Sequence, residues 1–212
     1  MYFCNDVDVM AWEPSIFFEA SFGHQAIVKA AGTLTGTALT VAAGTLVGVE
    51  AGMVATVETA DSSLTQLLEV VSVTDSAHAV LSALRGRGTE APLAPLAGGA
   101  VQVTVVSFRP QIAAVGDGLL AMVGVQSDRD AADPGIADTS GFRFATVFGV
   151  LCAVYRTLAD AKSATNLTYS KLGFYEGLYR GARRAIAATV DDDGDGLPET
   201  LRRAAVGEMV RG

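Results

Sequence analysis

Apolar residues recur at helical spacing over about the first thirty residues of the chain. Trp12, Glu13 and Pro14 are typical of a helix start, because proline suits a first turn, where its missing N–H is not needed. Apolar residues follow at intervals of three, four and seven, and Gly32 ends the pattern. This pattern predicts a helix over about residues 5–30 that packs against another element. Its apolar stripe consists of Ile16, Phe17, Ala20, Ile27 and Val28.

The next region, residues 32–107, is rich in Gly, Thr and Val and reads as β structure. Residues 33–41 alternate on either side of a glycine, which predicts a tight hairpin. Short β-branched runs follow, separated by polar turns, at the spacing of a small sandwich or barrel. The runs are Met53–Thr59, Leu67–Val73, Ala79–Leu84 and Val101–Val106. Residues 85–99 contain Gly, Pro and two arginines, and we expect a long loop that serves as a contact element.

The last region, residues 108–212, returns to helical spacing. Arg109 and Pro110 open an apolar pattern that ends near Gly124, and an acidic linker covers about 128–141. A wide apolar face between Phe144 and Leu158 predicts a second helix. A third is expected from about Leu167 to Val190.

These patterns predict an α+β fold in which a small antiparallel β-sandwich or barrel is inserted between helical segments. The expected divisions are a helical segment at 1–31, a β-rich domain at 32–107 and a helical domain at 108–212 that packs with residues 1–31. The chain has 212 residues, half of them hydrophobic, which is enough for a buried hydrophobic core in one domain or in two small ones.

Composition and charge exclude several classes of protein. The high apolar content disfavours disorder, and two cysteines cannot support a disulfide scaffold. A net charge of −8 disfavours a general nucleic-acid binder. Mean hydropathy is +0.36, but no uninterrupted apolar run approaches the roughly 20 residues of a membrane span, so no membrane partner is expected. The N-terminus lacks a secretory pattern, and Cys4 and Cys152 are expected to be reduced and buried or partly buried.

The acidic stretch Asp191–Glu199 is the sharpest local motif. It has the first half of an EF-hand loop, with acids at alternate positions, Gly196 for the sharp turn and the carbonyl of Leu197. Arg202 stands where an EF-hand has its bidentate glutamate, so two interpretations stay open. One is a weak divalent-cation site, with Ca²⁺ as the candidate. The other is an acidic turn neutralised by Arg202 and Arg203. The candidate ligands are Asp191, Asp193, Asp195 and Glu199.

A basic stretch precedes that loop in the otherwise acidic chain. It contains Lys171, Arg180, Arg183 and Arg184. These residues form either a solvated face paired with the acidic loop or a docking surface for an acidic partner, such as a neighbouring copy. A third interpretation, a track for phosphates, is disfavoured by the net charge of the chain. Phe17 and Phe18 are core or interface anchors, and Trp12 either staples the helix start or reaches a partner.

Catalytic chemistry finds little support in the sequence. His24 and His78 have no spacing to each other or to cysteine that suggests a zinc site. Neither cysteine lies in a nucleophile motif, and the chain has no phosphate loop or dinucleotide fingerprint. We therefore expect a protein that is not an enzyme and that needs no cofactor.

The layout of these segments is similar to the head–tail connector proteins of tailed bacteriophages, the adaptor or head-completion proteins. The likeness spans nearly the whole chain and rests on short stretches in a fixed order. They are Asp6–Pro14, Gly32–Thr40, Leu81–Arg85, Phe108–Ile112, Tyr175–Arg184 and Asp193–Arg202, followed by a short C-terminal strand.

The resemblance implies a virion structural protein of the neck, assembled in the host cytoplasm. Such adaptors form rings, commonly of twelve copies, that join the portal to the tail stopper or tail tube and extend the DNA channel without binding DNA specifically. The residues expected at the assembly contacts are Trp12, Phe17, Phe18, Tyr175, Tyr179, Arg180, Arg183 and Arg184. A small divalent-cation-binding interaction module that uses Asp191–Glu199 is the alternative.

Overall fold

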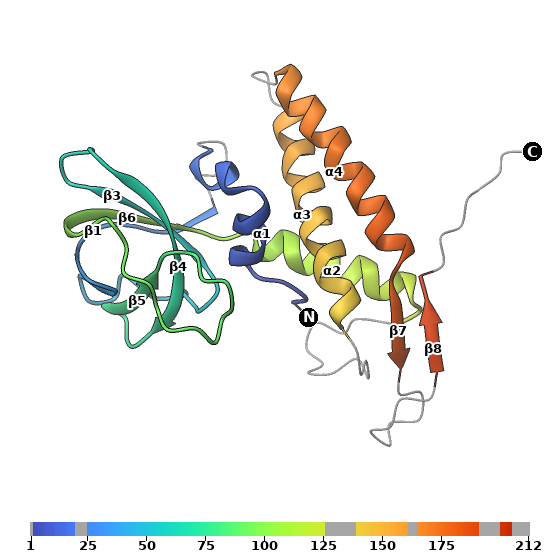
Figure 1. Cartoon of the computed structure of the whole chain (residues 1–212), viewed down its shortest axis with the longest axis horizontal. Helices are drawn as coiled ribbons and strands as arrows, with labels where there is room; N and C mark the ends of the chain where they lie inside the picture. Colours follow the sequence, from blue (N-terminus) through green and yellow to red (C-terminus); the bar gives the residue numbers. More distant parts are fainter. Residues whose placement is uncertain (1, 20–24, 126–138, 161–164, 191–199, 205–212) are drawn as a thin grey trace, which may run out of the picture. The chain divides into compact units, whose positions relative to one another are not determined.

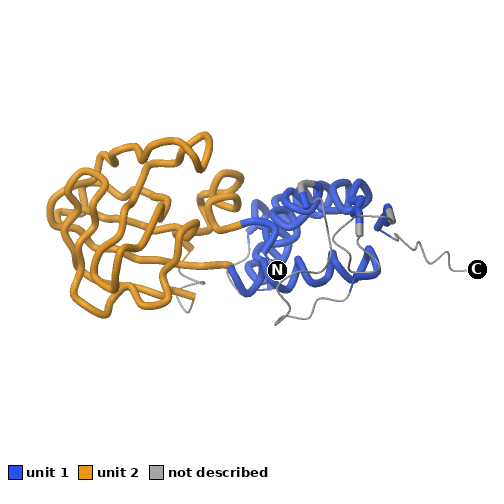
Figure 2. The backbone as a smooth tube through the Cα atoms, turned by 90° about the horizontal axis from the view of Figure 1, so that it is seen from below, with its two compact units in different colours: residues 1–4, 109–212 blue, residues 5–108 orange. Residues whose placement is uncertain are grey.

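A computed structural model describes residues 2–19, 25–125, 139–160, 165–190 and 200–204. The chain divides into two compact units, which Figure 2 colours separately. One unit is Asn5–Phe108, here called the barrel unit, and the other is Met1–Cys4 with Arg109–Gly212, here called the helical unit. The mixed α+β fold predicted from the sequence is confirmed, because helices accompany an antiparallel barrel.

The barrel unit is built on a closed barrel of six strands (Figure 1). Its strands are β1 (Ala26–Thr35), β2 (Ala38–Val41), β3 (Val54–Thr59), β4 (Thr65–Val73), β5 (His78–Ser82) and β6 (Gly99–Val106). Their order around the barrel is β1-β2-β5-β4-β3-β6, and β1 pairs with β6 to close it. All the pairings are antiparallel, and the predicted strand runs are confirmed.

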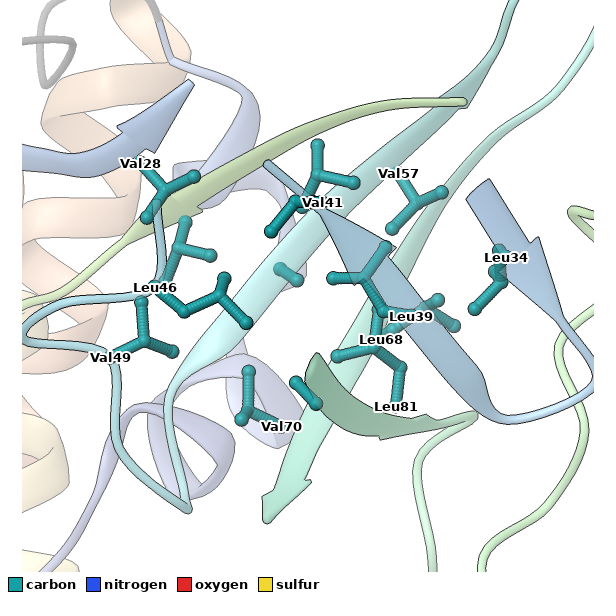
Figure 3. Packing of buried hydrophobic residues seen from close by; sticks show 14 of the residues in the cluster. Val28, Leu34, Leu39, Val41, Leu46, Val49, Val57, Leu68, Val70 and Leu81 are labelled. Carbon is teal, nitrogen blue, oxygen red and sulfur yellow. The ribbon is translucent and has the colours of Figure 1, made fainter. Parts of the chain in front are cut away.

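Local sequence explains the barrel strands. The predicted hairpin is confirmed: Thr35 pairs with Ala38 across a two-residue turn, and Gly36 takes a φ of +57° that other residues rarely adopt. In β6, valines alternate inward, separated by more exposed polar residues, which is the two-residue period of a strand. The inward side chains fill the barrel interior (Figure 3). They include Val28, Leu34, Leu39, Val41, Leu46, Val49, Val57, Leu68, Val70 and Leu81.

The helix predicted over residues 5–30 is wrong. The structure has α1 (Asp6–Trp12), a 3₁₀ helix η1 (Pro14–Phe18) and then β1 from Ala26. Pro14 divides the segment, because proline disfavours helical geometry in the residue before it, and Glu13 has φ −146° and ψ 78°. The apolar spacing that continued the pattern to Ile27 belongs to a strand.

The sequence had suggested that residues 1–31 pack with residues 108–212. In the structure, residues 5–31 belong instead to the barrel unit. Asn5 caps α1 in a capping box with Asp8. A carboxylate oxygen of the buried Asp6 accepts a hydrogen bond of 2.8 Å from the backbone N–H of Phe108. Val7 donates a backbone hydrogen bond to Gly52. These bonds fasten α1 to the barrel.

The helical unit contains three helices and a hairpin among its described residues. The elements are α2 (Arg109–Met122), α3 (Ser140–Asp160), α4 (Asn166–Arg184), β7 (Ala187–Val190) and β8 (Thr200–Arg203). The helices predicted near 109–124 and 144–158 are confirmed. The last helix ends at Arg184 and not at Val190, because Ile186 enters the core just before β7, and Ala188 enters it from β7, which pairs with β8.

The core of the helical unit gathers residues from distant parts of the chain. Phe3 stacks on Phe142 of α3 with ring centroids 4.5 Å apart. The buried members of this core include Leu119, Leu120, Val123, Phe142, Ala145, Ile186 and Ala188 of β7. The β7–β8 hairpin therefore covers one side of the core that the helices form.

Helix α3 differs from the sequence expectation in one respect. By length and composition alone, Gly141–Asp160 is long and apolar enough to cross a membrane, with a mean hydropathy of 1.4. However, 61% of that window is buried inside the protein. A core helix of a soluble protein meets the same criterion, so this single helix is weak evidence for a membrane span.

Candidate functional site

A pocket of about 430 Å³ opens in the helical unit where α2, α3 and α4 meet. Its lining combines apolar atoms with charged side chains. The lining residues are Val115 of α2, then Gly149, Cys152, Ala153 and Arg156 of α3, and Glu176, Tyr179, Arg180 and Arg183 of α4. We call this the arginine pocket.

Helical periodicity brings these side chains to one place. On α3, Gly149, Cys152 and Arg156 are separated by three and four residues, so they share a face. Glu176, Tyr179 and Arg183 have the same spacing on α4, which lies alongside α3 (Figure 1). The two stripes face each other and form the walls.

Gly149 sets the closeness of the three helices. A Cβ atom at this position would lie 2.6 Å from Cγ1 of Val115 and 3.0 Å from Cε2 of Tyr179. The first distance is shorter than the Cβ contacts found in proteins and the second is tighter than most of them, so a side chain here would displace the Val115 side chain and the tyrosine ring. Glycine thus lets Val115 and Tyr179 pack directly on the α3 backbone.

The pocket is positively charged. Arg156 donates a hydrogen bond of 2.8 Å from Nη2 to Oε1 of Glu176, and this pair neutralises one of three arginines. The guanidinium carbon of Arg183 lies 5.5 Å from the ring centroid of Tyr179, a cation–π distance. Its Nε is buried and has no hydrogen-bond partner among the described residues. Burial raises the pKa of the Tyr179 phenol, which therefore stays protonated near neutral pH.

Cys152 contributes a thiol rather than a thiolate. Burial raises its pKa to about 11, and the nearby Glu176 carboxylate acts in the same direction. At pH 8 the thiolate fraction is then about 100-fold lower than for a thiol at the ordinary value. Cys4 is also buried, so both cysteines have the predicted burial.

We expect Cys152 to resist alkylation at pH 8 and to react faster as the pH rises toward 11. The measurement is the rate of iodoacetamide labelling, followed by mass spectrometry, in the Cys4→Ser variant of the full chain. Because the folded-state pKa is raised, this thiol stabilises the fold below about pH 9 and loses that contribution as the pH rises through 11. Equal labelling rates at pH 8 with and without urea would contradict the expectation.

The residues predicted for α4 are not all at the surface. Tyr179, Arg180 and Arg183 line the arginine pocket, and Arg184 is exposed in the last helical turn. Tyr175 is buried and its ring is stacked on Tyr155, with centroids 5.6 Å apart.

Two charged residues of the pocket were not identified from the sequence. Arg156 and Glu176 are separated by 20 residues, and their ion pair depends on how α3 packs on α4. A positive charge at the end of an otherwise apolar helical face was the available signal for Arg156.

The predicted aromatic anchors of the barrel unit divide between core and surface. Phe17 is buried, with its ring edge-on to Phe108 at a centroid distance of 5.2 Å. Phe18 and Trp12 are both exposed. His78 is exposed as well and contacts Asp75 at 2.9 Å.

The candidate metal ligands Asp191, Asp193, Asp195 and Glu199 lie outside the described residues. Within the described ranges, no group of three or more His, Cys, Asp or Glu side chains could hold a metal ion. Arg202, one of the two arginines considered as neutralising the acidic turn, donates to the carbonyl of Gly124 at 3.0 Å.

The chemistry that the arginine pocket can perform is recognition of anions. Guanidinium groups donate paired N–H groups that match the geometry of carboxylates and phosphates. A thiol with a raised pKa is a weak nucleophile, so Cys152 adds an apolar wall and not a reactive group. Comparison of the chain with protein-family models, curated protein sequences and solved structures gives no match.

Proposed function

We propose that the chain is a structural protein of the neck of a tailed bacteriophage. In this role it is a head–tail adaptor that assembles as a ring, joins the portal to the tail stopper or tail tube, and extends the DNA channel. It performs no reaction. The first support is the order of segments that resembles adaptor proteins, including a barrel inserted between Cys4 and Arg109 of the helical unit.

The observation that carries the proposal is the exposed apolar surface of α4. Leu167 and Phe174 are 65% and 60% exposed and are seven residues apart, about two helical turns, so they share one face of α4. Arginines continue the same helix toward its C-terminus. Aromatic side chains and arginine are the residues most enriched at protein interfaces, and we assign this helix to the contact between copies.

A second exposed apolar surface lies on the barrel unit, in the loop between β5 and β6. Leu93 and Leu96 project from this loop, and Leu96 is 84% exposed. The loop is nevertheless anchored, because the side-chain carbonyl of Gln66 accepts hydrogen bonds of 3.0 Å from the backbone N–H groups of Leu96 and Ala97. A fixed loop with apolar tips suits contact with another neck protein.

The net charge supports the channel role. The chain carries 23 acidic and 15 basic residues, so a ring of copies repels the DNA backbone. A channel that must release DNA should not hold its phosphates. The protein would be found in the virion neck after assembly in the host cytoplasm.

The test is assembly on the portal protein encoded in the same genome. We expect the full chain, co-expressed with that portal, to purify as a complex in which electron microscopy shows a ring. The Phe174→Ser variant should lower the yield of complex about tenfold or more, because it removes an interface aromatic. Arg109→Ser is the control, since Arg109 begins α2 and its guanidinium lies over the ring of Tyr2. Purified virions that lack the chain, or a chain that consumes a substrate, would contradict the proposal.

A further inference from the structure

We propose that the arginine pocket receives carboxylates from the barrel unit of a second copy of this chain. The inference rests on the proposed ring and names the contact that joins its neighbours. The pocket and the carboxylates lie on different units. Each copy therefore binds one neighbour through its pocket and the other neighbour through its barrel unit. Contacts of this heterologous kind repeat around a ring until it closes.

Charge complementarity is the first argument. Residues 5–108 contain ten acidic and three basic side chains, so most of the net charge of −8 belongs to the barrel unit. The arginine pocket has three arginines against one glutamate. Opposite charges that face each other across an interface speed association and fix the register of the partners.

The β3–β4 turn carries a suitable carboxylate. Asp61 is exposed, and hydrogen bonds from Thr59 and Ser63 lower its pKa to about 2, so it stays ionised at neutral pH. The hydroxyl of Thr59 donates at 2.6 Å, and Ser63 donates its hydroxyl and its backbone N–H. All of these bonds end on Oδ1, which leaves Oδ2 for an incoming guanidinium. The turn holds the carboxylate in place and reduces the entropy lost on binding.

The pocket holds its guanidinium groups in place in the same way. Arg183 lies over the Tyr179 ring, and Arg156 is paired with Glu176 although its side chain is 64% exposed. Arg180 is exposed at the same wall. A pocket of about 430 Å³ has room for an acidic side chain, which two guanidinium groups could bind together.

The experiment is a complementation test by sedimentation velocity. The pocket variant Arg156→Glu/Arg180→Glu changes two exposed side chains and keeps Arg183. The turn variant Asp61→Asn removes the charge of the turn and keeps an oxygen that can accept the hydrogen bonds from Thr59 and Ser63. We expect each variant of the full chain to self-associate at least about tenfold more weakly than the wild-type chain. Mixed together, the two should form a one-to-one dimer, because each retains the surface that the other lacks.

The Arg203→Glu variant is the control, since Arg203 is exposed on β8 of the same unit and does not line the pocket. It should associate as the wild-type chain does. Association should also weaken with rising salt. A pocket variant that associates normally, or a mixture that stays monomeric, overturns the inference. A wild-type chain that is monomeric alone also overturns it, whereas ring assembly on the portal would in that case leave the proposed function standing.

Discussion

The Glu69→Ala variant should lose about 3–5 kcal/mol of the free energy of unfolding of the barrel unit. Glu69 on β4 and Arg85 form an ion pair whose side chains are only 10% and 6% exposed. Nε of Arg85 donates to Oε2 of Glu69 at 3.1 Å, and Nη2 donates to Oε1 at 2.5 Å. Alanine would leave a buried guanidinium without its counter-charge, and this is far more costly than the loss of an exposed pair.

The double variant Glu69→Leu/Arg85→Met separates the loss of the ion pair itself from the cost of leaving Arg85 without a partner. With both charges gone and the volume retained, stability should recover most of the way, since no buried charge is left unpaired. The exposed pair of Arg156 and Glu176 gives the matched comparison, and Arg156→Ala should cost less than about 1 kcal/mol. Urea unfolding followed by the fluorescence of Trp12, the only tryptophan of the chain, reports on the barrel unit. An unchanged urea midpoint for Glu69→Ala would contradict this account.

The same ion pair controls the loop that we assign to a neck neighbour. Nη1 of Arg85 donates to the carbonyl of Glu90 at 2.6 Å, and a carboxylate oxygen of Glu90 accepts from the backbone N–H of Gly86. These bonds hold the first part of the loop in one conformation. In Glu69→Ala, limited proteolysis should therefore cut the loop sooner than in the wild-type chain.

The barrel strands could be predicted from the sequence because their signals are local. Alternating valines in β6 and a glycine turn between β1 and β2 act within a few residues, and both patterns survive folding. The end of α4 was placed too late for a related reason. Ile186 fits a helical face, but it packs into the core from the short link between α4 and β7.

The arginine pocket could not be derived in this way. Its walls come from α2, α3 and α4, and which stripes face each other depends on Gly149, where Val115 and Tyr179 pack against the α3 backbone. The sequence identified the basic residues of α4 but not Arg156, because the register between two helices is set by packing and not by spacing along the chain. Tyr175 shows the opposite error, since an aromatic residue expected at a contact between copies is stacked inside its own unit.

The Phe17→Ala variant should destabilise the barrel unit by about 3–5 kcal/mol. Phe17 lies in the segment that the sequence placed on a long helix, and its ring packs edge-on against Phe108 at the end of β6. Both rings are buried, with Phe17 5% exposed and Phe108 fully covered. The truncation leaves a cavity at the point where η1 is fastened to the barrel, so fluorescence of the nearby Trp12 should report a lower urea midpoint.

Phe18→Ala is the matched control, because it removes the same ring from the next residue, where 53% of the side chain is exposed. Its stability should stay within about 0.5 kcal/mol of the wild-type value. The two variants therefore separate the roles that the sequence could not distinguish: a core ring changes the urea midpoint, and an interface ring changes portal binding and leaves the midpoint alone. If Phe17→Ala kept the wild-type midpoint, η1 would not be packed against Phe108, and the assignment of residues 5–31 to the barrel unit would fail with it.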